Sequence, residues 1–505
     1  MAREYSRRRV LASAGLALTA GAAVGRVGAS RPERPRNRST ADPPALRWTE
    51  VFDVSDTDSV TAATTTDEGL VVGTGTTAGE EGTVPWVFAV DAQGDGQWQH
   101  PLPGGENPRT LDAAPGHGGG VVVSGELRPT EGANQAFLAR LDEAGERQWR
   151  TTVDPPMEEA VAFGVTRVAS GYLVVGGTRN DERTEALVAR VDDEGAVQWS
   201  RAVSGGQLSL LYALDSAGEE DEDETYVACG VARPEATSGQ SAPPEGWITG
   251  LDSEGETQWS ASHRVESGGQ PASLGLYRDV AATGDGYLLV GRTRPPEASG
   301  SAAWAVATDP TGTRVGQLVG GVGESPQNSR FEGVAEYDGE YVAVGSVQSD
   351  DASGEFLYVG LDSAAARVWN TTQAVGDSGR ATAVTPAVDS GLYALGTTTS
   401  RSGTESTESA AVVKLGGETE ATPTPTATPE PTPTASPTPT ATPEPTPTQT
   451  PSPTPTTTPT GIDGQTRTPA DATETTSENG PGVGVVGTLA ALSAGVLSRR
   501  LSREE

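Results

Sequence analysis

Residues 171–199 contain three short apolar runs, which read Gly171-Tyr-Leu-Val-Val-Gly-Gly177, Ala186-Leu-Val-Ala-Arg-Val-Asp192-Asp-Glu-Gly195 and Val197-Gln-Trp199. The runs are rich in β-branched residues and are separated by Gly and Asp, which is typical of β-strands joined by tight turns. One more apolar run, Val161-Ala-Phe-Gly-Val-Thr166, precedes them. The sequence therefore predicts a unit of four short strands.

This unit recurs between Leu46 and Gly417 in seven copies, spaced by roughly 50 to 60 residues. The clearest copies end in a tryptophan, at Trp98, Trp149, Trp199, Trp259 and Trp369. Four short strands per repeat, without a competing helical period, are typical of the blades of a β-propeller. We therefore predict an all-β fold, a seven-bladed β-propeller with four-stranded blades, with six or eight blades as the alternatives.

The two ends of the repeat region complement each other. Leu46-Arg-Trp48-Thr-Glu-Val51 is an isolated strand, and the last copy stops at Ala411-Val-Val-Lys-Leu415 without a tryptophan strand after it. We expect the N-terminal strand to complete the last blade, which would remove the exposed sheet edges of an open array.

Each recurring Asp-x-x-Gly element is interpreted as a hairpin turn. Glycine can adopt the positive φ that such turns require, and the aspartate can accept a bond from the backbone two residues on. A metal-binding or catalytic role for these aspartates is the alternative. The tryptophans are expected to pack between neighbouring blades, although one copy has Val315 at this position.

The segments outside residues 46–417 indicate export and attachment. Ser6-Arg7-Arg8-Arg9-Val10-Leu11 and the apolar run after it resemble a twin-arginine signal peptide, which we place at residues 1–29, followed by a linker at 30–45. Residues 418–480 are rich in Thr and Pro and are predicted to form an extended, disordered stalk. Asn37 and Asn370 begin N-glycosylation sequons, and the stalk threonines are candidate O-glycan acceptors.

The C-terminal tail, residues 481–505, begins Pro481-Gly482-Val483, continues as an apolar run and ends with Arg499, Arg500 and Arg503. It resembles the Pro-Gly-Phe type of sorting signal of archaeal surface proteins, which a membrane enzyme removes and replaces by a lipid. A plain transmembrane helix is the alternative. Either one predicts a protein anchored to the outer face of the cell membrane.

The composition is strongly acidic, with 69 Asp and Glu against 35 Lys and Arg, of which Lys414 is the single lysine. This bias resembles that of haloarchaeal proteins. The net charge of −34 argues against nucleic acid as a partner. The run Glu219–Glu224 is interpreted as a solvated loop, with a calcium site as the alternative.

Motifs for chemistry are missing from the sequence. The three histidines, His100, His117 and His263, have no metal-ligand spacing, and we expect them on loops or at the surface. The repeats resemble those of secreted bacterial and archaeal propeller proteins, which implies fold more than activity. We expect a noncatalytic recognition or structural module with no cofactor, binding an unidentified extracellular ligand or surface component. A quinoprotein-like oxidoreductase with a propeller-bound quinone is the alternative.

A ligand of a propeller would lie where the innermost strands begin. Arg109, Tyr277, Arg278, Arg330 and Arg380 fall at or near those positions. Guanidinium groups offer a planar fork for carboxylate or phosphate, so we predict that these residues receive an anionic group. The alternative is that the arginines pair with nearby carboxylates of the same chain.

Overall fold

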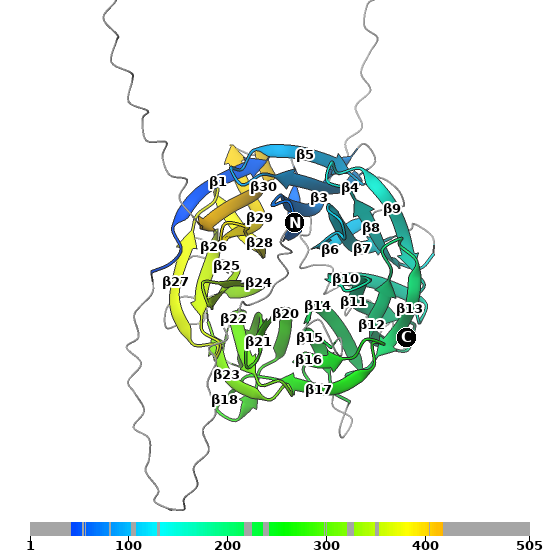
Figure 1. The fold of residues 1–505 in the computed structure, drawn as a ribbon. Coiled ribbons are helices and arrows are strands. Elements are labelled where there is room, and N and C mark those ends of the chain that lie inside the picture. The colour runs from blue at the N-terminus through cyan, green and yellow to red at the C-terminus, as the bar shows by residue number, and fades with distance from the viewer. Residues whose placement is uncertain are drawn as a thin grey trace, which may run out of the picture. The chain divides into compact units, whose positions relative to one another are not determined.

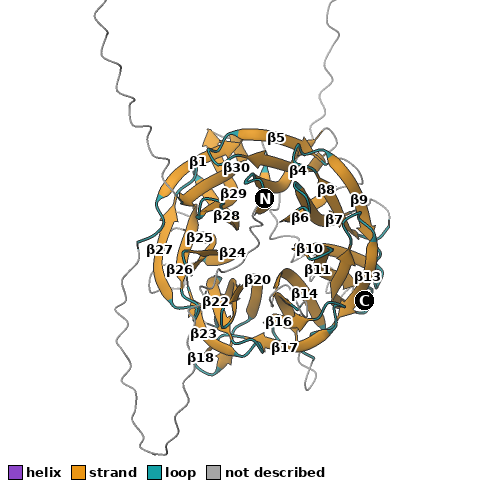
Figure 2. Cartoon of the chain, in the orientation of Figure 1, coloured by secondary structure: helices purple, strands orange, loops and turns teal. Residues whose placement is uncertain are grey.

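The computed structural model describes residues 42–417 apart from 53–54, 56, 80–81, 103–107, 129–131, 217–224, 236–241, 297, 299, 321–327, 349–352 and 403–404. Regular structure in these residues is entirely β-strand, and small antiparallel sheets stand around a common axis (Figures 1 and 2). The predicted all-β, propeller-like class is therefore confirmed. The predicted signal peptide, stalk and C-terminal tail, the acidic run 219–224 and Asn37 lie outside the described residues.

Four sheets have four strands that pair in chain order. They are β2 (Ser59–Thr65), β3 (Val71–Gly79), β4 (Gly82–Val90) and β5 (Gly96–Pro101); β6 (Arg109–Pro115), β7 (Val121–Leu127), β8 (Gln135–Leu141) and β9 (Arg147–Val153); β20 (Leu274–Thr283), β21 (Gly286–Arg294), β22 (Ala302–Thr308) and β23 (Arg314–Val319); and β24 (Ser329–Tyr337), β25 (Glu340–Gln348), β26 (Gly354–Leu361) and β27 (Arg367–Gln373).

A fifth four-stranded sheet joins the two ends of the repeat region, in the order β1-β30-β29-β28. Its strands are β28 (Ser378–Pro386), β29 (Gly391–Ser402), β30 (Glu405–Gly416) and β1 (Leu46–Phe52). The register pairs Thr49 with Val413 and Val51 with Ala411, so the N-terminal strand completes the C-terminal sheet as expected.

The remaining large sheet has eight strands. They are β10 (Glu159–Val168), β11 (Gly171–Arg179), β12 (Thr184–Val191), β13 (Val197–Val203), β14 (Leu208–Ser216), β15 (Tyr226–Arg233), β16 (Glu245–Leu251) and β17 (Thr257–His263). Strands β12 and β14 share the single parallel pair Thr184 and Leu208, whereas the other pairs in this sheet are antiparallel ladders. A two-stranded hairpin, β18 (Glu266–Ser267) with β19 (Gln270–Pro271), is separate.

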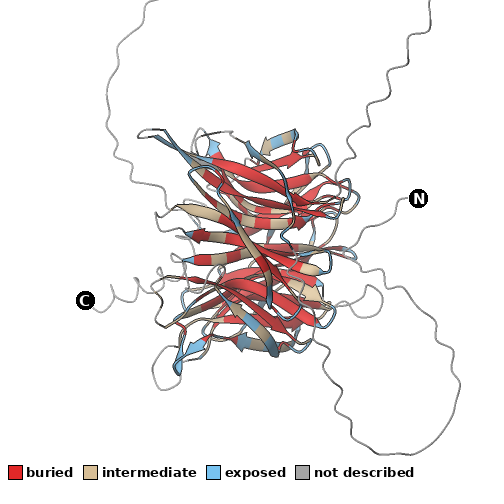
Figure 3. Ribbon diagram, turned by 90° about the vertical axis from the view of Figure 1, so that its left-hand side faces the viewer, coloured by how far each residue is buried: buried red, intermediate tan, exposed pale blue. Residues whose placement is uncertain are grey.

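The hydrophobic core lies between the faces of neighbouring sheets (Figure 3). The second strand of a sheet is buried on both faces, as in β11, where Tyr172, Leu173, Val174 and Val175 are fully buried. The outermost strands alternate between exposed and half-buried residues, as in β5. The apolar runs that repeat in the sequence are therefore the strands that pack between two neighbouring sheets.

The Asp-x-x-Gly elements form the predicted turns. The Oδ1 atom of Asp142 accepts hydrogen bonds from the backbone N–H groups of Ala144 and Glu146 at 3.0 and 2.9 Å. Its Oδ2 atom accepts one from the Gln148 amide at 2.6 Å. Equivalent bonds form at Asp91 and Asp252. The aspartates thus have the structural role that we predicted.

The tryptophans pack between neighbouring sheets, as predicted. Trp149 on β9 donates from Nε1 to the Asp193 carbonyl oxygen at 2.9 Å, in the turn of the next sheet. Its ring lies over Gly195, where an added Cβ would be 2.8 Å from the indole. Gly195 also has a φ of 87°, so both its backbone conformation and its neighbour require glycine.

A β-bulge interrupts the innermost strand of each repeat, because its pairing with the second strand skips one residue. In β20, for example, Arg278 lies between the paired residues Tyr277 and Asp279. A glycine on the second strand of each repeat permits the close contact beside the bulge. A Cβ at Gly291 would lie 2.2 Å from the Leu276 carbonyl oxygen.

Candidate functional site

The bulges place one side chain of each innermost strand at an equivalent position near the axis of the ring. These bulge residues are Thr61, Leu111, Phe163, Tyr212, Arg278, Glu332 and Thr382. Phe163, Tyr212, Arg278 and Glu332 form a row in which each contacts the next, from the inner strands β10, β14, β20 and β24. Figure 1 shows these strands around the axis of the ring. The rings of Phe163 and Tyr212 are 5.2 Å apart, the Arg278 guanidinium lies 5.1 Å from the Tyr212 ring centre, and Arg278 contacts Glu332.

Glu332 is the anionic centre of this row. Its carboxylate accepts from Arg278 Nε at 2.8 Å and lies 2.9 Å from Arg330 Nε. The side chains of Arg278, Arg330 and Glu332 are 28, 22 and 16% exposed, so solvent reaches the group. Burial opposes ionisation of Glu332, but the two arginines outweigh it and hold the pKa of its carboxyl below the usual value. Glu332 is therefore ionised at neutral pH.

Two more arginines adjoin this ion pair. Arg292 on β21 interacts electrostatically with Glu332, Arg278 and Arg330, and Arg380 on β28 interacts with Arg330, Glu408 and Glu332. Burial lowers the pKa of both guanidinium groups, and their acidic neighbours only partly offset it. Among the described residues, neither guanidinium has a hydrogen-bonded carboxylate, and Arg292 Nε is buried without a partner.

Arg278 differs from Arg292 and Arg380 because its guanidinium is hydrogen-bonded to the Glu332 carboxylate. Burial opposes its charge, but Glu332 outweighs the burial and raises the pKa of the Arg278 guanidinium. Four guanidinium groups thus surround one partly buried carboxylate in a chain whose formal charge is −34. We call Arg278, Arg292, Arg330, Arg380 and Glu332 the inner arginine cluster.

Tyr212 borders the cluster on β14. The residue is 5% exposed, and its hydroxyl is buried without a hydrogen-bond partner among the described residues. Burial raises the pKa of the phenol to about 12, although Arg278 and Arg292 oppose the shift. The hydroxyl is therefore protonated at neutral pH and can donate a hydrogen bond.

The structure brings three of the five predicted ligand-binding residues together, namely Arg278, Arg330 and Arg380. Arg109 instead lies 3.3 Å from Glu126 on β7, which also pairs with Arg128. The alternative interpretation, pairing with nearby carboxylates, therefore describes Arg109. It also describes Arg278 and Arg330 through Glu332.

Tyr277 does not belong to the cluster, which corrects its predicted place among the ligand-binding residues. Its side chain is fully buried between sheets, where the ring stacks on Trp304 with centres 4.8 Å apart. Its hydroxyl bonds to His263 Nδ1 at 2.7 Å. Tyr277 therefore belongs to the core between sheets, whereas the next residue, Arg278, is the unpaired residue of the bulge. His263 is buried as well, contrary to the expected loop or surface position.

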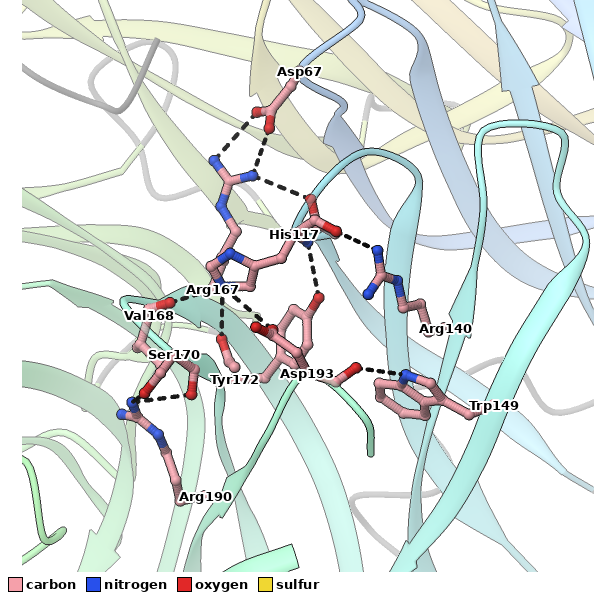
Figure 4. A network of polar contacts seen from close by, with 12 residues as sticks. Asp67, His117, Arg140, Trp149, Arg167, Val168, Ser170, Tyr172, Arg190 and Asp193 are labelled. Carbon is pink, nitrogen blue, oxygen red and sulfur yellow. Dashed lines mark hydrogen bonds and ion pairs between the residues drawn. The ribbon is translucent and has the colours of Figure 1, made fainter. Parts of the chain in front are cut away.

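A second polar group surrounds His117 in the β6–β7 turn (Figure 4). Its Nε2 lies 2.8 Å from the Val168 carbonyl oxygen, and its backbone N–H donates to the Tyr172 hydroxyl at 3.0 Å. Arg167 binds both carboxylate oxygens of Asp67. These groups satisfy one another across three sheets, so we assign them a structural role. No group of three or more His, Cys, Asp or Glu within the described part of the chain could hold a metal ion.

The remaining site predictions concern glycosylation and the membrane. Asn370 lies on the outermost strand β27, half-buried and opposite Val359 in the ladder. Its glycosylation stays a prediction. The part of the chain that the structure describes contains no helix long and apolar enough to span a membrane, and residues 481–505 lie outside it.

No protein-family model and no curated protein matches the chain. Among solved structures, Sqt1 from Chaetomium thermophilum is 14% identical with a TM-score of 0.40, over 70% of this chain and 82% of its own. A quinohemoprotein alcohol dehydrogenase from Pseudomonas putida HK5 is 10% identical with a TM-score of 0.38, over 74% of this chain and 77% of its own. A protein of unknown function from Dyadobacter fermentans is 10% identical with a TM-score of 0.43, over 74% of this chain and all of its own. Similarity at this level carries no information about activity.

Proposed function

We propose that the protein is a noncatalytic recognition module of the cell surface, a seven-bladed propeller that binds a ligand at its inner arginine cluster. The blade count is supported by the eight-stranded sheet, whose halves share only the pair Thr184 and Leu208. Counted as two blades, it brings the five four-stranded sheets to seven. The propeller would be exported through the twin-arginine signal, carried on the glycosylated Thr/Pro stalk and anchored by the tail, as in a haloarchaeal surface protein.

The observation that carries this proposal is the gathering of four arginines around Glu332 in an otherwise acidic chain. A surface with so many carboxylates repels anions in general, so the excess of arginines in this cluster makes it a preferred binding site for an anion. Binding fits the cluster better than catalysis. Glu332 is held ionised by Arg278 and Arg330 and is a weak base, and Tyr212, with a pKa of about 12, is a weak nucleophile at neutral pH.

A thermal-shift panel on the full chain in molar potassium chloride tests this function. The panel contains saccharides, small anions, calcium, and pyrroloquinoline quinone with calcium. A ligand that prefers the folded state raises the melting temperature, so a saccharide or anion response supports recognition. A response to the quinone alone would replace the proposal by the quinoprotein alternative.

The location is tested separately on intact cells that produce the protein. A protease added outside should cleave within residues 418–480 and release residues 46–417, with lysed cells as the control. Protection in intact cells and cleavage after lysis would contradict surface display.

A further inference from the structure

We propose that Arg292 and the Tyr212 hydroxyl bind an oxyanion, that is, a carboxylate, sulfate or phosphate group of the ligand. This inference rests on the proposed recognition function and names the chemistry of its ligand. Sequence reasoning selected neither residue.

Both groups are donors for which the described residues supply no acceptor. The Tyr212 hydroxyl and Arg292 Nε are buried without a hydrogen-bond partner, although buried polar groups are nearly always paired. The two side chains interact with each other electrostatically, and both interact with Arg278. An acceptor placed beside them would satisfy both donors at once.

The acceptor must come with negative charge. Arg278 and Arg330 share Glu332, which leaves the charges of Arg292 and Arg380 without a hydrogen-bonded carboxylate among the described residues. The net positive charge repels cations, and a neutral hydrogen-bond acceptor would bind there little better than water does. An oxyanion offers several oxygens, which suits the fork of a guanidinium together with a phenolic O–H.

Phe163 adds a preference for what carries the anionic group. The residue is half-buried on β10 and contacts the Tyr212 ring edge-on, whereas Arg278 reaches Tyr212 from β20, the other inner strand that neighbours β14. A ligand whose oxyanion is attached to an apolar group or to a sugar ring can cover Phe163 while its charge reaches Arg292. We therefore expect benzoate or glucuronate to bind more tightly than acetate.

The test is calorimetric titration of the full chain in molar potassium chloride, so that screening is the same for every probe. The probes are sulfate, phosphate, acetate, benzoate and glucuronate, which separate a free inorganic anion from a carboxylate on a larger group. Tyr212→Phe and Arg292→Gln should each weaken binding about tenfold, since each loses a charge-assisted donor. Arg367→Gln, on the outer strand β27, removes the same charge at an exposed position and should bind as the wild type does.

The unliganded proteins show whether a variant is folded. Tyr212→Phe should melt at the same temperature as the wild type or higher, because it removes a buried hydroxyl that has no partner. Equal affinity in the wild type and both site variants would overturn the inference and leave recognition at another site. In the thermal-shift panel, a response to a saccharide or calcium without a response to any oxyanion would overturn the inference alone, whereas a response to the quinone alone would overturn the proposed function as well.

Discussion

Gly316 on β23 packs directly against Ala364 in the β26–β27 turn, where a Cβ added at Gly316 would lie 2.1 Å from the Ala364 carbonyl oxygen. Gly316 pairs with Ala307 as Trp149 pairs with Arg140, so it holds the tryptophan position that was predicted for Val315, which is 62% exposed. The next residue of the turn, Ala365, is fully buried with a φ of 59°, a left-handed conformation that usually requires glycine. At the seam of Trp149 and Gly195, the indole fills the space that the methyl group of an alanine would need. The methyl group of Ala365 is thus accommodated where no indole competes for its place.

The seam at Gly195 predicts a destabilising substitution. Gly195→Ala should lower the free energy of unfolding by about 2–4 kcal/mol, because it adds left-handed strain to a clash with the Trp149 ring. Gly268→Ala is the matched control, since Gly268 has a φ of 59° and open space around it. It should cost about 1 kcal/mol from the strain alone. Denaturant unfolding measures both, and equal losses would show that the ring contact is unimportant.

The seam at Gly316 predicts a second destabilising substitution. Gly316→Ala should lower the free energy of unfolding by about 1–3 kcal/mol, because its methyl group would overlap the Ala364 carbonyl oxygen. Gly96→Ala on the outermost strand β5 is the matched control, since its methyl group would meet only Phe52 at 4.0 Å. Denaturant unfolding measures both variants. Equal stabilities would contradict the close packing of Gly316 on Ala364.

His263 predicts a pH-dependent stability. Gly312 O can only accept, so Nε2 carries the proton and Nδ1 accepts from the Tyr277 hydroxyl. Burial lowers the pKa of His263, although the Gly312 carbonyl opposes the shift. The unfolded chain therefore binds a proton near pH ~6.5, where the folded chain does not. The free energy of unfolding should fall as the pH drops through this value, and the loss should end below the folded pKa.

Unfolding of His263→Gln between neutral and mildly acidic pH isolates this contribution. Its free energy of unfolding should change less over that interval than that of the wild type, by up to about 1.4 kcal/mol per pH unit. His100→Gln changes a less buried histidine on an outermost strand and serves as the control. A slope for His263→Gln that equals the wild-type slope would contradict the assignment.

Glu332 predicts a link between stability and anions. Glu332→Gln leaves four guanidinium groups without their shared carboxylate and should lower the free energy of unfolding by about 1–3 kcal/mol. Added sulfate should restore part of the stability that Glu332→Gln loses. The control Glu405→Gln changes an exposed glutamate, and sulfate should stabilise it no more than it stabilises the wild type. The pKa of Glu332 is lowered, so its contribution is present at neutral pH and is lost as the pH falls through that pKa. Equal effects of sulfate on both variants would contradict the role of Glu332.

The all-β ring could be predicted because each repeat shows the same evidence of strands and turns. Asp142 and Trp149 mark the same places in one copy as Asp91 and Trp98 do in another, and the missing last strand indicated the pairing of β1 with β30. The repeats predict a blade boundary between β13 and β14, whereas in the structure one backbone pair, Thr184 with Leu208, joins the two ladders into one sheet.

The site could be predicted only in part. Arg330 and Arg380 follow from their positions near the start of an inner strand, but a simple alternation of strand residues does not locate a bulge. Tyr277 is therefore selected from the sequence along with Arg278, although Tyr277 is buried in the core between sheets and Arg278 pairs with Glu332. Arg292 was missed because it lies on the second strand. Arg292 could have been found because it follows the repeat glycine Gly291, a position at which the other copies have small, apolar or acidic residues.

The inner arginine cluster is tested most directly by locating a bound anion. Crystals of the chain grown in molar potassium chloride with selenate would show the anion through the anomalous scattering of selenium. The account predicts a selenium peak whose oxygens lie within hydrogen-bonding distance of the Arg292 guanidinium and the Tyr212 hydroxyl. Selenate bound only elsewhere, with water as the sole neighbour of both donors, would contradict it.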